Sequence, residues 1–183
     1  METKSNIYPR VMTAMMAAVI SAVSPFALPI GPISLSLCTL VLYVAPYILG
    51  WRGSAAAALV FILLGTVGMP VFTGFQGGLG KVIGPTGGYI VGYIPLVVIT
   101  GLTIRFFPRN RALQYLGMVG ATAVLYTLGT IWFMFQSGNN LAASLAACVF
   151  PFIPGDLIKM AVAVVFGPEL RERLVLANIH PEG

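Results

Sequence analysis

Long apolar stretches, separated by short polar or glycine-rich segments, dominate the pattern of this sequence. Each of six stretches approaches the roughly 20 residues that an α-helix needs to cross the hydrocarbon core of a bilayer. The spans are expected at residues 11–28, 35–50, 54–72, 88–107, 112–136 and 141–168. The pattern therefore predicts an all-α integral membrane protein, a bundle of six transmembrane helices that forms a single domain over residues 1–183.

The composition also indicates a lipid environment. The chain is 58% hydrophobic and only 8% charged, with a mean hydropathy of +0.94. A soluble domain carries about 25% charged residues, so this chain has too few polar side chains to cover its surface in water. The net charge of +5 does not indicate nucleic-acid binding, because the basic residues lie between the apolar stretches and form no basic face.

The basic residues predict which way the bundle faces. In a six-span topology, the basic residues that flank the spans all fall on one side of the membrane. They are Lys4, Arg10, Arg52, Arg105, Arg109, Arg111, Arg171 and Arg173. Because cytoplasmic loops carry an excess of Lys and Arg, both termini are expected in the cytoplasm. Five or seven spans would scatter these charges over both sides.

An unusual glycine-rich segment, MPVFTGFQGGLGKVIGPTGG, connects the third and fourth predicted spans. It is too long for a tight turn, and it carries apolar and aromatic residues that a solvated connector would avoid. Glycines at Gly77, Gly78, Gly87 and Gly88 permit backbone shapes closed to other residues and close approach to a ligand. We expect an ordered outer loop that folds over a cavity. A flexible connector is the alternative.

Only one acidic residue lies inside a predicted span. Asp156 precedes Lys159 by three positions in PFIPGDLIKM, so both side chains lie on one face of a helix. A charge in the hydrocarbon costs roughly 2.5–3.5 kcal/mol, which makes such a pair a functional candidate. We favour a pair that faces a ligand and opens to the outside. The other interpretation is a structural ion pair that locks two helices together.

Other candidate ligand contacts are weaker. Gln76 and Phe75 lie in the glycine-rich segment and Tyr89 follows it, although tyrosines are also common at membrane interfaces. The two cysteines, Cys38 and Cys148, lie far apart in apolar stretches without metal-ligand spacing. The sequence has no catalytic triad, nucleotide-binding or metalloenzyme motif, so we expect no enzyme and no cofactor. Active transport would then need energy from other subunits.

Small residues form a stripe in the first predicted span. Ala14, Ala18 and Ala22 recur at every fourth position. Such stripes let helices approach closely in lipid. The stripe either packs within this chain or receives a partner protein.

Two segments, GMPVFTGFQGGLGKVIGPTGGYIVGY and PFIPGDLIK, resemble the BioY family, the biotin-binding S components of energy-coupling factor (ECF) vitamin transporters. The resemblance covers about residues 14–167. It implies six transmembrane helices in the bacterial plasma (inner) membrane, with a biotin cavity near the outer face. It also implies coupling to a membrane-embedded T component, which Ala14 and Ala18 would contact, and to two ATPase subunits.

The resemblance assigns site residues where the motif matches. Asp156 and Lys159 match the family's PGD-x-x-K helix and would contact biotin. The signature that closes the site is matched by Gly77, Gly78, Gly84, Pro85, Gly87, Gly88 and Tyr89. Asp156 can accept hydrogen bonds from the ureido N–H groups. Lys159 can meet the carboxylate or, with biotin reversed, the ureido oxygen, and Phe72 and Phe75 can pack on the apolar middle of the ligand.

One segment departs from the family pattern. GPISLSLCTL stands where GPVPITLQTL is usual, so Ser34, Ser36 and Cys38 replace proline, threonine and glutamine. The missing glutamine takes away a polar group available for a ligand contact or a helix tie. Two alternatives to biotin uptake stay open: an S component for another small vitamin, and a non-transporting scaffold held together by the Asp156–Lys159 pair.

Overall fold

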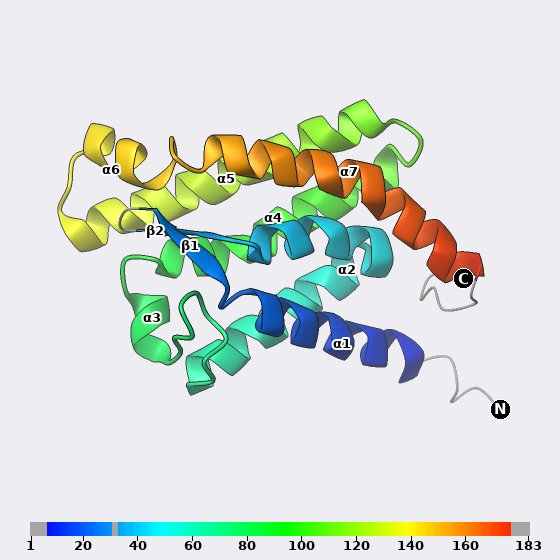
Figure 1. Ribbon diagram of the computed structural model, residues 1–183, viewed down its shortest axis with the longest axis horizontal. Coiled ribbons are helices and arrows are strands. Elements are labelled where there is room, and N and C mark those ends of the chain that lie inside the picture. Colours follow the sequence, from blue (N-terminus) through cyan, green and yellow to red (C-terminus); the bar gives the residue numbers. More distant parts are fainter. Residues whose placement is uncertain (1–6, 31–32, 177–183) are drawn as a thin grey trace.

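The computed structural model describes residues 7–30 and 33–176, which fold mainly into helices that run along the long axis of the molecule (Figure 1). The helices are α1 (Ile7–Val23), α2 (Cys38–Val67), α3 (Leu79–Ile83), α4 (Gly87–Phe106), α5 (Arg111–Ser137), α6 (Leu141–Cys148) and α7 (Ile153–Leu176). Two short strands, β1 (Ala27–Ile30) and β2 (Ile33–Ser36), pair as an antiparallel hairpin. The all-α prediction did not contain this hairpin.

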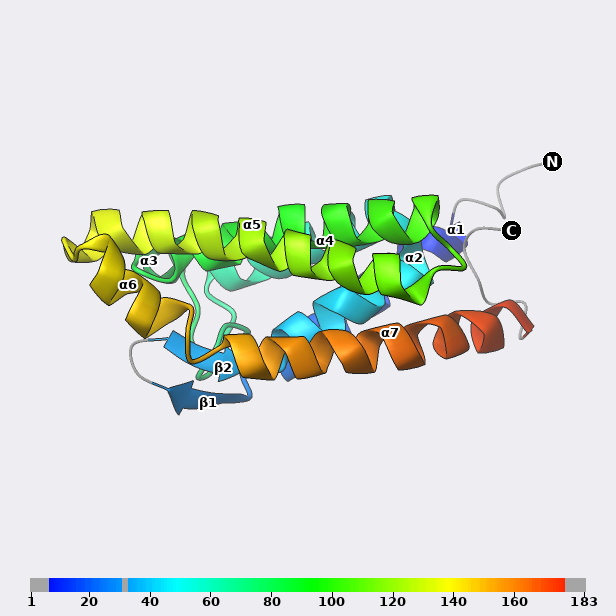
Figure 2. The ribbon, with the colours of Figure 1, turned by 90° about the horizontal axis from the view of Figure 1, so that it is seen from above.

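The second and third predicted spans fall within the single element α2. The helix is broken at Gly50, whose φ of 66° and ψ of −179° are not helical. Figures 1 and 2 both show the chain reversing direction there, so that the arm before Gly50 and the arm after it run in opposite directions. Glycine adopts a positive φ without a steric penalty, so the chain reverses here without a loop.

The bundle has two distinct ends. The helix α1 begins and α7 ends at one of them, which we call the terminal end (Figures 1 and 2). The hairpin, α3 and α6 lie at the opposite end, which we call the hairpin end. Large side chains that are almost completely buried fill the space between the helices; they include Leu42, Tyr43, Phe61, Leu96 and Met118.

Three helices, α2, α4 and α5, are long and apolar enough to cross a membrane. The helices α6 and α7 add a fourth crossing if they form one broken span, because they pass together and are bent by 48° at their junction. The helix α1 is apolar but has only 17 residues. Outward-facing hydrophobic side chains such as Phe135, 86% exposed, suit contact with lipid. The structure therefore supports a helical, multi-pass membrane protein, and the count of six spans stays a prediction.

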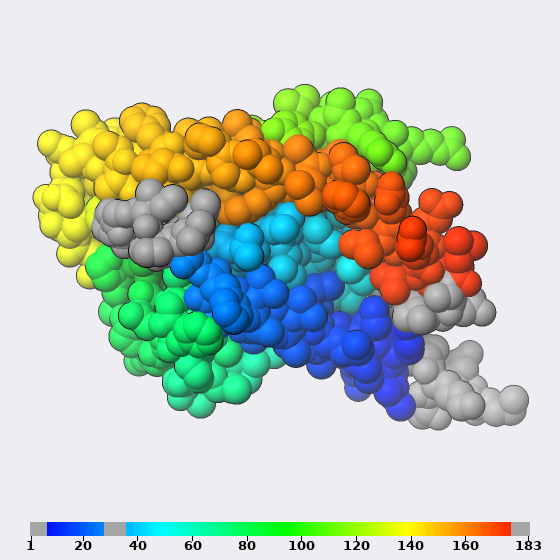
Figure 3. Space-filling model, viewed as in Figure 1, coloured from blue at the N-terminus to red at the C-terminus, as the bar shows by residue number. Residues whose placement is uncertain are grey.

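The space-filling view shows α1 and α7 on the same face of the molecule, with part of α2 visible between them (Figure 3). On α1, Ala17 and Ile20 are the residues buried against the bundle. Ala14 and Ala18 are exposed, as is Ala22. The described part of the chain therefore leaves the alanine stripe uncovered.

Candidate functional site

Asp156 and Lys159 form a buried ion pair in the first turns of α7. Lys159 Nζ lies 2.9 Å from Asp156 Oδ1, and the two residues are only 8% and 4% exposed, respectively. The same ammonium donates to the backbone carbonyl of Ser36 at 2.8 Å and to Thr39 Oγ1 at 3.0 Å. An ammonium group has three N–H donors, so each donor of Lys159 has an acceptor within the protein.

The carboxylate of Asp156 has its own partners. Tyr126 donates its hydroxyl to Oδ2 at 2.6 Å, and Thr39 Oγ1 lies 3.3 Å from Oδ1. We call Ser36, Thr39, Tyr126, Asp156 and Lys159 the Lys159 cluster. It joins β2, the start of α2, α5 and α7 around one pair of charges. A buried ion pair is tolerated only when further hydrogen bonds satisfy its remaining groups, and this cluster provides them.

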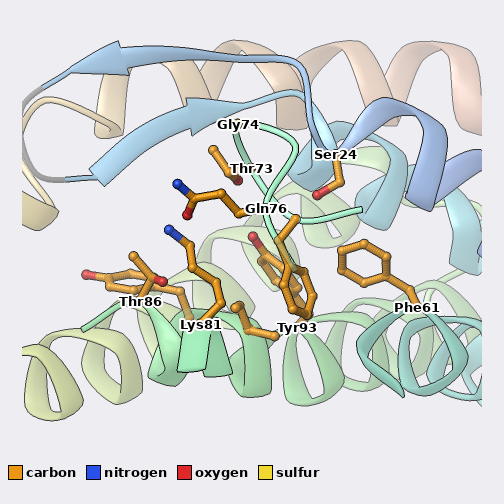
Figure 4. Close-up of a pocket in the computed structure, with 11 residues that line it drawn as sticks. Ser24, Phe61, Thr73, Gly74, Gln76, Lys81, Thr86 and Tyr93 are labelled. Atoms are coloured by element: carbon orange, nitrogen blue, oxygen red, sulfur yellow. The ribbon is translucent and has the colours of Figure 1, made fainter. Parts of the chain in front are cut away.

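The Lys159 cluster also forms the wall of a small cavity of about 60 Å³, together with Tyr89 and Tyr93 of α4. A larger cavity of about 180 Å³ adjoins it and is lined by the same two tyrosines. The rest of its lining is Ser24, Phe61, Phe72, Thr73, Gly74, Gln76, Lys81, Thr86 and Ile90 (Figure 4). Two cavities with different polar groups therefore meet at a pair of aromatic rings.

The larger cavity has a polar corner made by Gln76, Lys81 and Thr86, which we call the Lys81 corner. In Figure 4 the amine of Lys81 and the amide of Gln76 point toward the same space. Thr86 Oγ1 is buried without a hydrogen-bond partner. Within the described residues, 7–30 and 33–176, the Lys81 ammonium makes no ion pair or hydrogen bond. The side-chain amide of Gln76 makes none there either. This corner offers donors that the protein leaves unused.

The glycine-rich segment positions these groups by bonding to neighbouring elements. Phe72 and Gln76 pair with each other through both backbone N–H groups. Gly74 donates to the carbonyl of Pro25 at 3.0 Å, and Gly78 donates to the carbonyl of Gly65 at 2.7 Å. The segment is thereby tied to the turn after α1 and to the end of α2. The short helix α3 follows and carries Lys81 at its centre.

The glycines predicted to contact a ligand have packing roles. A side chain at Gly77 would overlap the carbonyl of Met69, and one at Gly87 would overlap the carbonyl of Val82. A side chain at Gly88 would overlap Trp132 of α5. Gly78 has a φ of 96°, which favours glycine. None of these four lines either of the two cavities described here; they shape the loop and the contact between α4 and α5.

Of the remaining predicted ligand contacts, some line the two cavities and one does not. Tyr89 and Gln76 line the cavities, as does Phe72, which is 2% exposed. Phe75 lines neither cavity: it is 59% exposed, and its ring packs edge-on against Phe26 with the ring centres 5.4 Å apart. The prediction that Phe75 packs on the ligand therefore has no support from its position.

The sequence departure at Ser36 and Cys38 leaves the ion pair intact. Lys159 binds the backbone carbonyl of Ser36, which any residue supplies. The Ser36 hydroxyl donates to the carbonyl of Ser24 at 3.2 Å and accepts from the N–H of Cys38 at 3.0 Å. Cys38 is fully buried. The side chain of Ser34 lies outside the described residues.

Sequence reasoning did not assign Lys81, Thr86, Thr39 or Tyr126 to the site. Threonines and tyrosines are common in membrane helices, so their type carries little information. Lys81 stood out only as one of two basic residues outside the regions flanking the predicted spans. Its isolation from the other basic residues was the available signal, because a lysine on the less basic side of a membrane needs a separate explanation.

A third cavity, of about 210 Å³, lies where the two arms of α2 meet. Gly50, Tyr47, Arg105 and Arg171 are among its lining residues. Tyr47 donates its hydroxyl to Gln114 at 2.7 Å, and its ring packs so closely on Gly167 of α7 that no side chain fits there. The first arm of α2 and α7 are therefore in direct contact near this cavity.

Comparison with known proteins identifies the family. Residues 1–175 match the model of the BioY family. A probable biotin transporter BioY of Pyrococcus horikoshii is 32% identical over 87% of this chain and 94% of its own length. A biotin transporter BioY of Rhodobacter capsulatus is 34% identical over 74% of this chain and 78% of its own length.

A solved structure agrees with these relatives. The crystal structure of the S-component for biotin from an ECF-type ABC transporter has a TM-score of 0.86 with this chain at 27% identity. The match covers 94% of this chain and 95% of that one. Fold, family model and relatives together confirm the resemblance seen in the two motifs: the chain belongs to the BioY family.

Proposed function

We propose that this protein takes up biotin across the bacterial plasma membrane as the substrate-binding S component of an ECF-type transporter. The observation that carries the proposal is the pair of adjoining cavities in a BioY chain. Biotin has a polar ureido ring at one end, a carboxylate at the other and apolar atoms between them. The Lys159 cluster, the Tyr89 and Tyr93 rings and the Lys81 corner offer polar, aromatic and polar surfaces in the same order.

Six membrane crossings fit this function. They are α1, the two arms of α2, α4, α5 and the broken pair α6–α7. Successive crossings run in opposite directions (Figures 1 and 2), so α1 begins and α7 ends at the same end. Arg52, Arg105 and Arg171 follow or end helical segments that reach the terminal end, which supports the proposal that this end faces the cytoplasm and the two adjoining cavities face the outside. Lys4, which also supported this orientation, lies outside the described residues.

Biotin binding by the purified protein tests the proposal. We expect radiolabelled biotin to bind with saturation and to be displaced by unlabelled biotin, whereas thiamine and riboflavin in equal excess leave it bound. Displacement by one of these vitamins, with no saturable biotin binding, would favour an S component for another vitamin. Absence of binding by any vitamin would favour the scaffold alternative.

The partners proposed from the family are a T component and two ATPase subunits. The exposed Ala14–Ala18 stripe of α1 supports a docking role, because small residues on a lipid-facing helix let another helix approach closely. ATP hydrolysis would take place in the partners, and this chain would supply the ligand site.

Enlarging the alanine stripe should separate docking from binding. We expect Ala18→Leu to retain biotin binding but to lose copurification with the T component and most of the uptake, because leucine holds the partner helix away. Val19→Leu is the matched control, since Val19 is exposed at the adjacent position of α1 and lies off the stripe. Normal copurification of Ala18→Leu would contradict the docking role of the stripe.

The scaffold alternative rests on one specific observation. Every donor of Lys159 is satisfied inside the protein, as a purely structural ion pair requires. The carboxylate of Asp156, however, also allows a ligand-binding role. Its Oδ2 accepts only one hydrogen bond from the described residues and retains the capacity to accept another. Asp156 can therefore hold the cluster together and also accept a ligand N–H.

A further inference from the structure

Two arginines from different helices meet at a cavity at the terminal end of the molecule. Arg105 lies in the last turn of α4, and Arg171 lies in the last two turns of α7. Both line the cavity of about 210 Å³ beside Gly50, and no acidic residue is part of its lining. Within residues 7–30 and 33–176, neither guanidinium makes an ion pair or a hydrogen bond. The cavity is therefore lined by two positive charges that the described part of the chain does not neutralise.

This pair of guanidinium groups favours an anion with several oxygen atoms. A guanidinium presents its N–H donors as a planar fork that matches a phosphate, and it is more weakly hydrated than an ammonium. Hydrogen bonds of this kind are charge-assisted and are among the stronger ones in proteins. A single water needs only roughly 10–15 Å³ of accessible space. A cavity of about 210 Å³ therefore has room for a phosphate group.

The surface beside this cavity indicates that the phosphate belongs to a lipid. An open groove of about 430 Å³ adjoins the cavity and shares part of its lining with it, including Arg171. Most of the other groove residues are apolar: Ile104, Pro108, Pro168, Val175 and Leu176. Glu172 also lines the groove, but it is exposed and pairs with neither arginine. A charged cavity beside an apolar groove matches a molecule with an anionic head and an apolar chain.

The place of the cavity in the bundle also suits a lipid headgroup. Trp51 is part of the cavity lining, and tryptophan is enriched where membrane and water meet. In the orientation proposed above, the terminal end faces the cytoplasm, and the cytoplasmic leaflet is the one that carries anionic lipids. The ends of α4 and α7 pack little against each other directly, so a molecule held by both arginines would join them.

We infer that Arg105 and Arg171 bind the phosphate of an anionic phospholipid of the cytoplasmic leaflet, with its apolar part in the adjoining groove. This site lies at the end of the bundle opposite to the Lys159 cluster and the Lys81 corner, and it takes a different class of ligand. The inference goes beyond the proposed function and uses only the orientation given there. The lipid would serve as a fixed component that holds the cytoplasmic ends of α4 and α7.

A simpler explanation of the two arginines is that they counter the helix dipoles and the charge of the membrane surface as a whole. Cations near the C-terminus of a helix are favourable without any ligand. The same explanation applies to Arg173, in the last turn of α7, and to Arg109, which follows α4. Both are exposed, and neither lines the cavity or the groove. They therefore provide a control pair with the same charge.

The experiment measures the binding of phosphatidylglycerol and phosphatidylcholine, with identical acyl chains, to the purified protein in detergent by native mass spectrometry. We expect the wild-type protein to bind phosphatidylglycerol about tenfold more tightly, because only this lipid has a net negative charge for the two arginines. Arg105→Gln combined with Arg171→Gln should bring the two affinities within about threefold of each other. Arg109→Gln combined with Arg173→Gln removes the same charge and should keep the tenfold preference.

Biotin binding by the same preparations shows whether the variants are folded, because none of these arginines lines the two adjoining cavities. If the double variant at Arg105 and Arg171 does not fold, Arg171→Gln alone is the test, and it should reduce the preference at least about threefold. Inorganic phosphate in large molar excess should leave phosphatidylglycerol bound.

Three results would overturn the inference. The first is equal affinity of the wild-type protein for the two lipids. The second is an equal loss of preference in both double variants, which would show attraction to the basic surface as a whole. The third is displacement of the lipid by inorganic phosphate, which would show that the cavity takes a free anion. Failure to bind biotin with the lipid preference intact would overturn the proposed function alone.

Discussion

Replacing Asp156 by asparagine is expected to reduce biotin uptake by roughly a hundredfold or more, because breaking a buried ion pair on one side costs about 3–5 kcal/mol. Asparagine keeps the shape of the side chain but leaves the Lys159 ammonium buried without a counter-charge. It also places an amide where Tyr126 and a ligand N–H would find a carboxylate. Uptake of radiolabelled biotin in a biotin-requiring host, at matched amounts of protein in the membrane, measures the effect.

A second variant separates a ligand-binding role of Asp156 from a structural one. Asp156→Asn combined with Lys159→Gln removes both charges, so no buried charge is left unpaired. We expect this double variant to recover the thermal stability of the wild-type protein in detergent while still failing to bind biotin. Recovery of biotin binding together with stability would support the scaffold alternative, in which the pair only joins α7 to β2 and α2.

Replacing Gly129 by alanine is expected to weaken biotin binding about tenfold or more, since overpacking in a well-packed core typically costs about 1–3 kcal/mol. A Cβ at this position of α5 would overlap the ring of Tyr89. That ring lines both adjoining cavities, and its hydroxyl donates to the carbonyl of Cys148 at 3.2 Å. The alanine would therefore push the aromatic wall into the space proposed for the ligand. Titration of the purified variant with biotin tests this.

The chain offers a matched control for this variant. Gly120 lies on the same helix, and a Cβ there would meet no atom within 4 Å. Gly120→Ala should therefore bind biotin as the wild-type protein does and be at least as stable, because alanine favours the helix and narrows the unfolded ensemble. Normal biotin affinity in Gly129→Ala would show that the position of Tyr89 does not matter for binding.

Several features of the fold and site could be predicted from the sequence, because they follow from the free-energy cost of placing charged side chains in an apolar environment. A charged pair inside an apolar stretch is expensive, so Asp156 and Lys159 had to be close to each other, and they are. Their spacing of three residues already placed them on one face of a helix. The motifs around them also predicted the family, which the relatives and the solved structure confirm.

Other features depend on contacts between distant segments, which local patterns do not record. The two arms of α2 are joined by a single glycine with positive φ, so two predicted spans appear as one helical element. The partners of Lys159 include a backbone carbonyl of β2, which no residue type reveals. Phe75 looked like a ligand contact because it is aromatic and lies in the glycine-rich segment. Its ring packs against Phe26, an exposed residue beside the hairpin, and this contact cannot be seen in the local sequence; the ligand contact stays a prediction.

The direct packing of Tyr47 on Gly167 has a mechanical consequence. The first arm of α2 and the helix α7 each begin at the Lys159 cluster and extend to the cavity lined by Arg105 and Arg171. Near that cavity the contact between Tyr47 and Gly167 holds the two helices together. The two helices are thus in contact at both ends, through the Lys159 cluster at one end and through Tyr47 and Gly167 at the other. Unless one of them bends, neither can tilt at the hairpin end without moving the arginine-lined surface at the terminal end. A partner in contact with that surface would then sense the state of the distant cavities without touching the ligand.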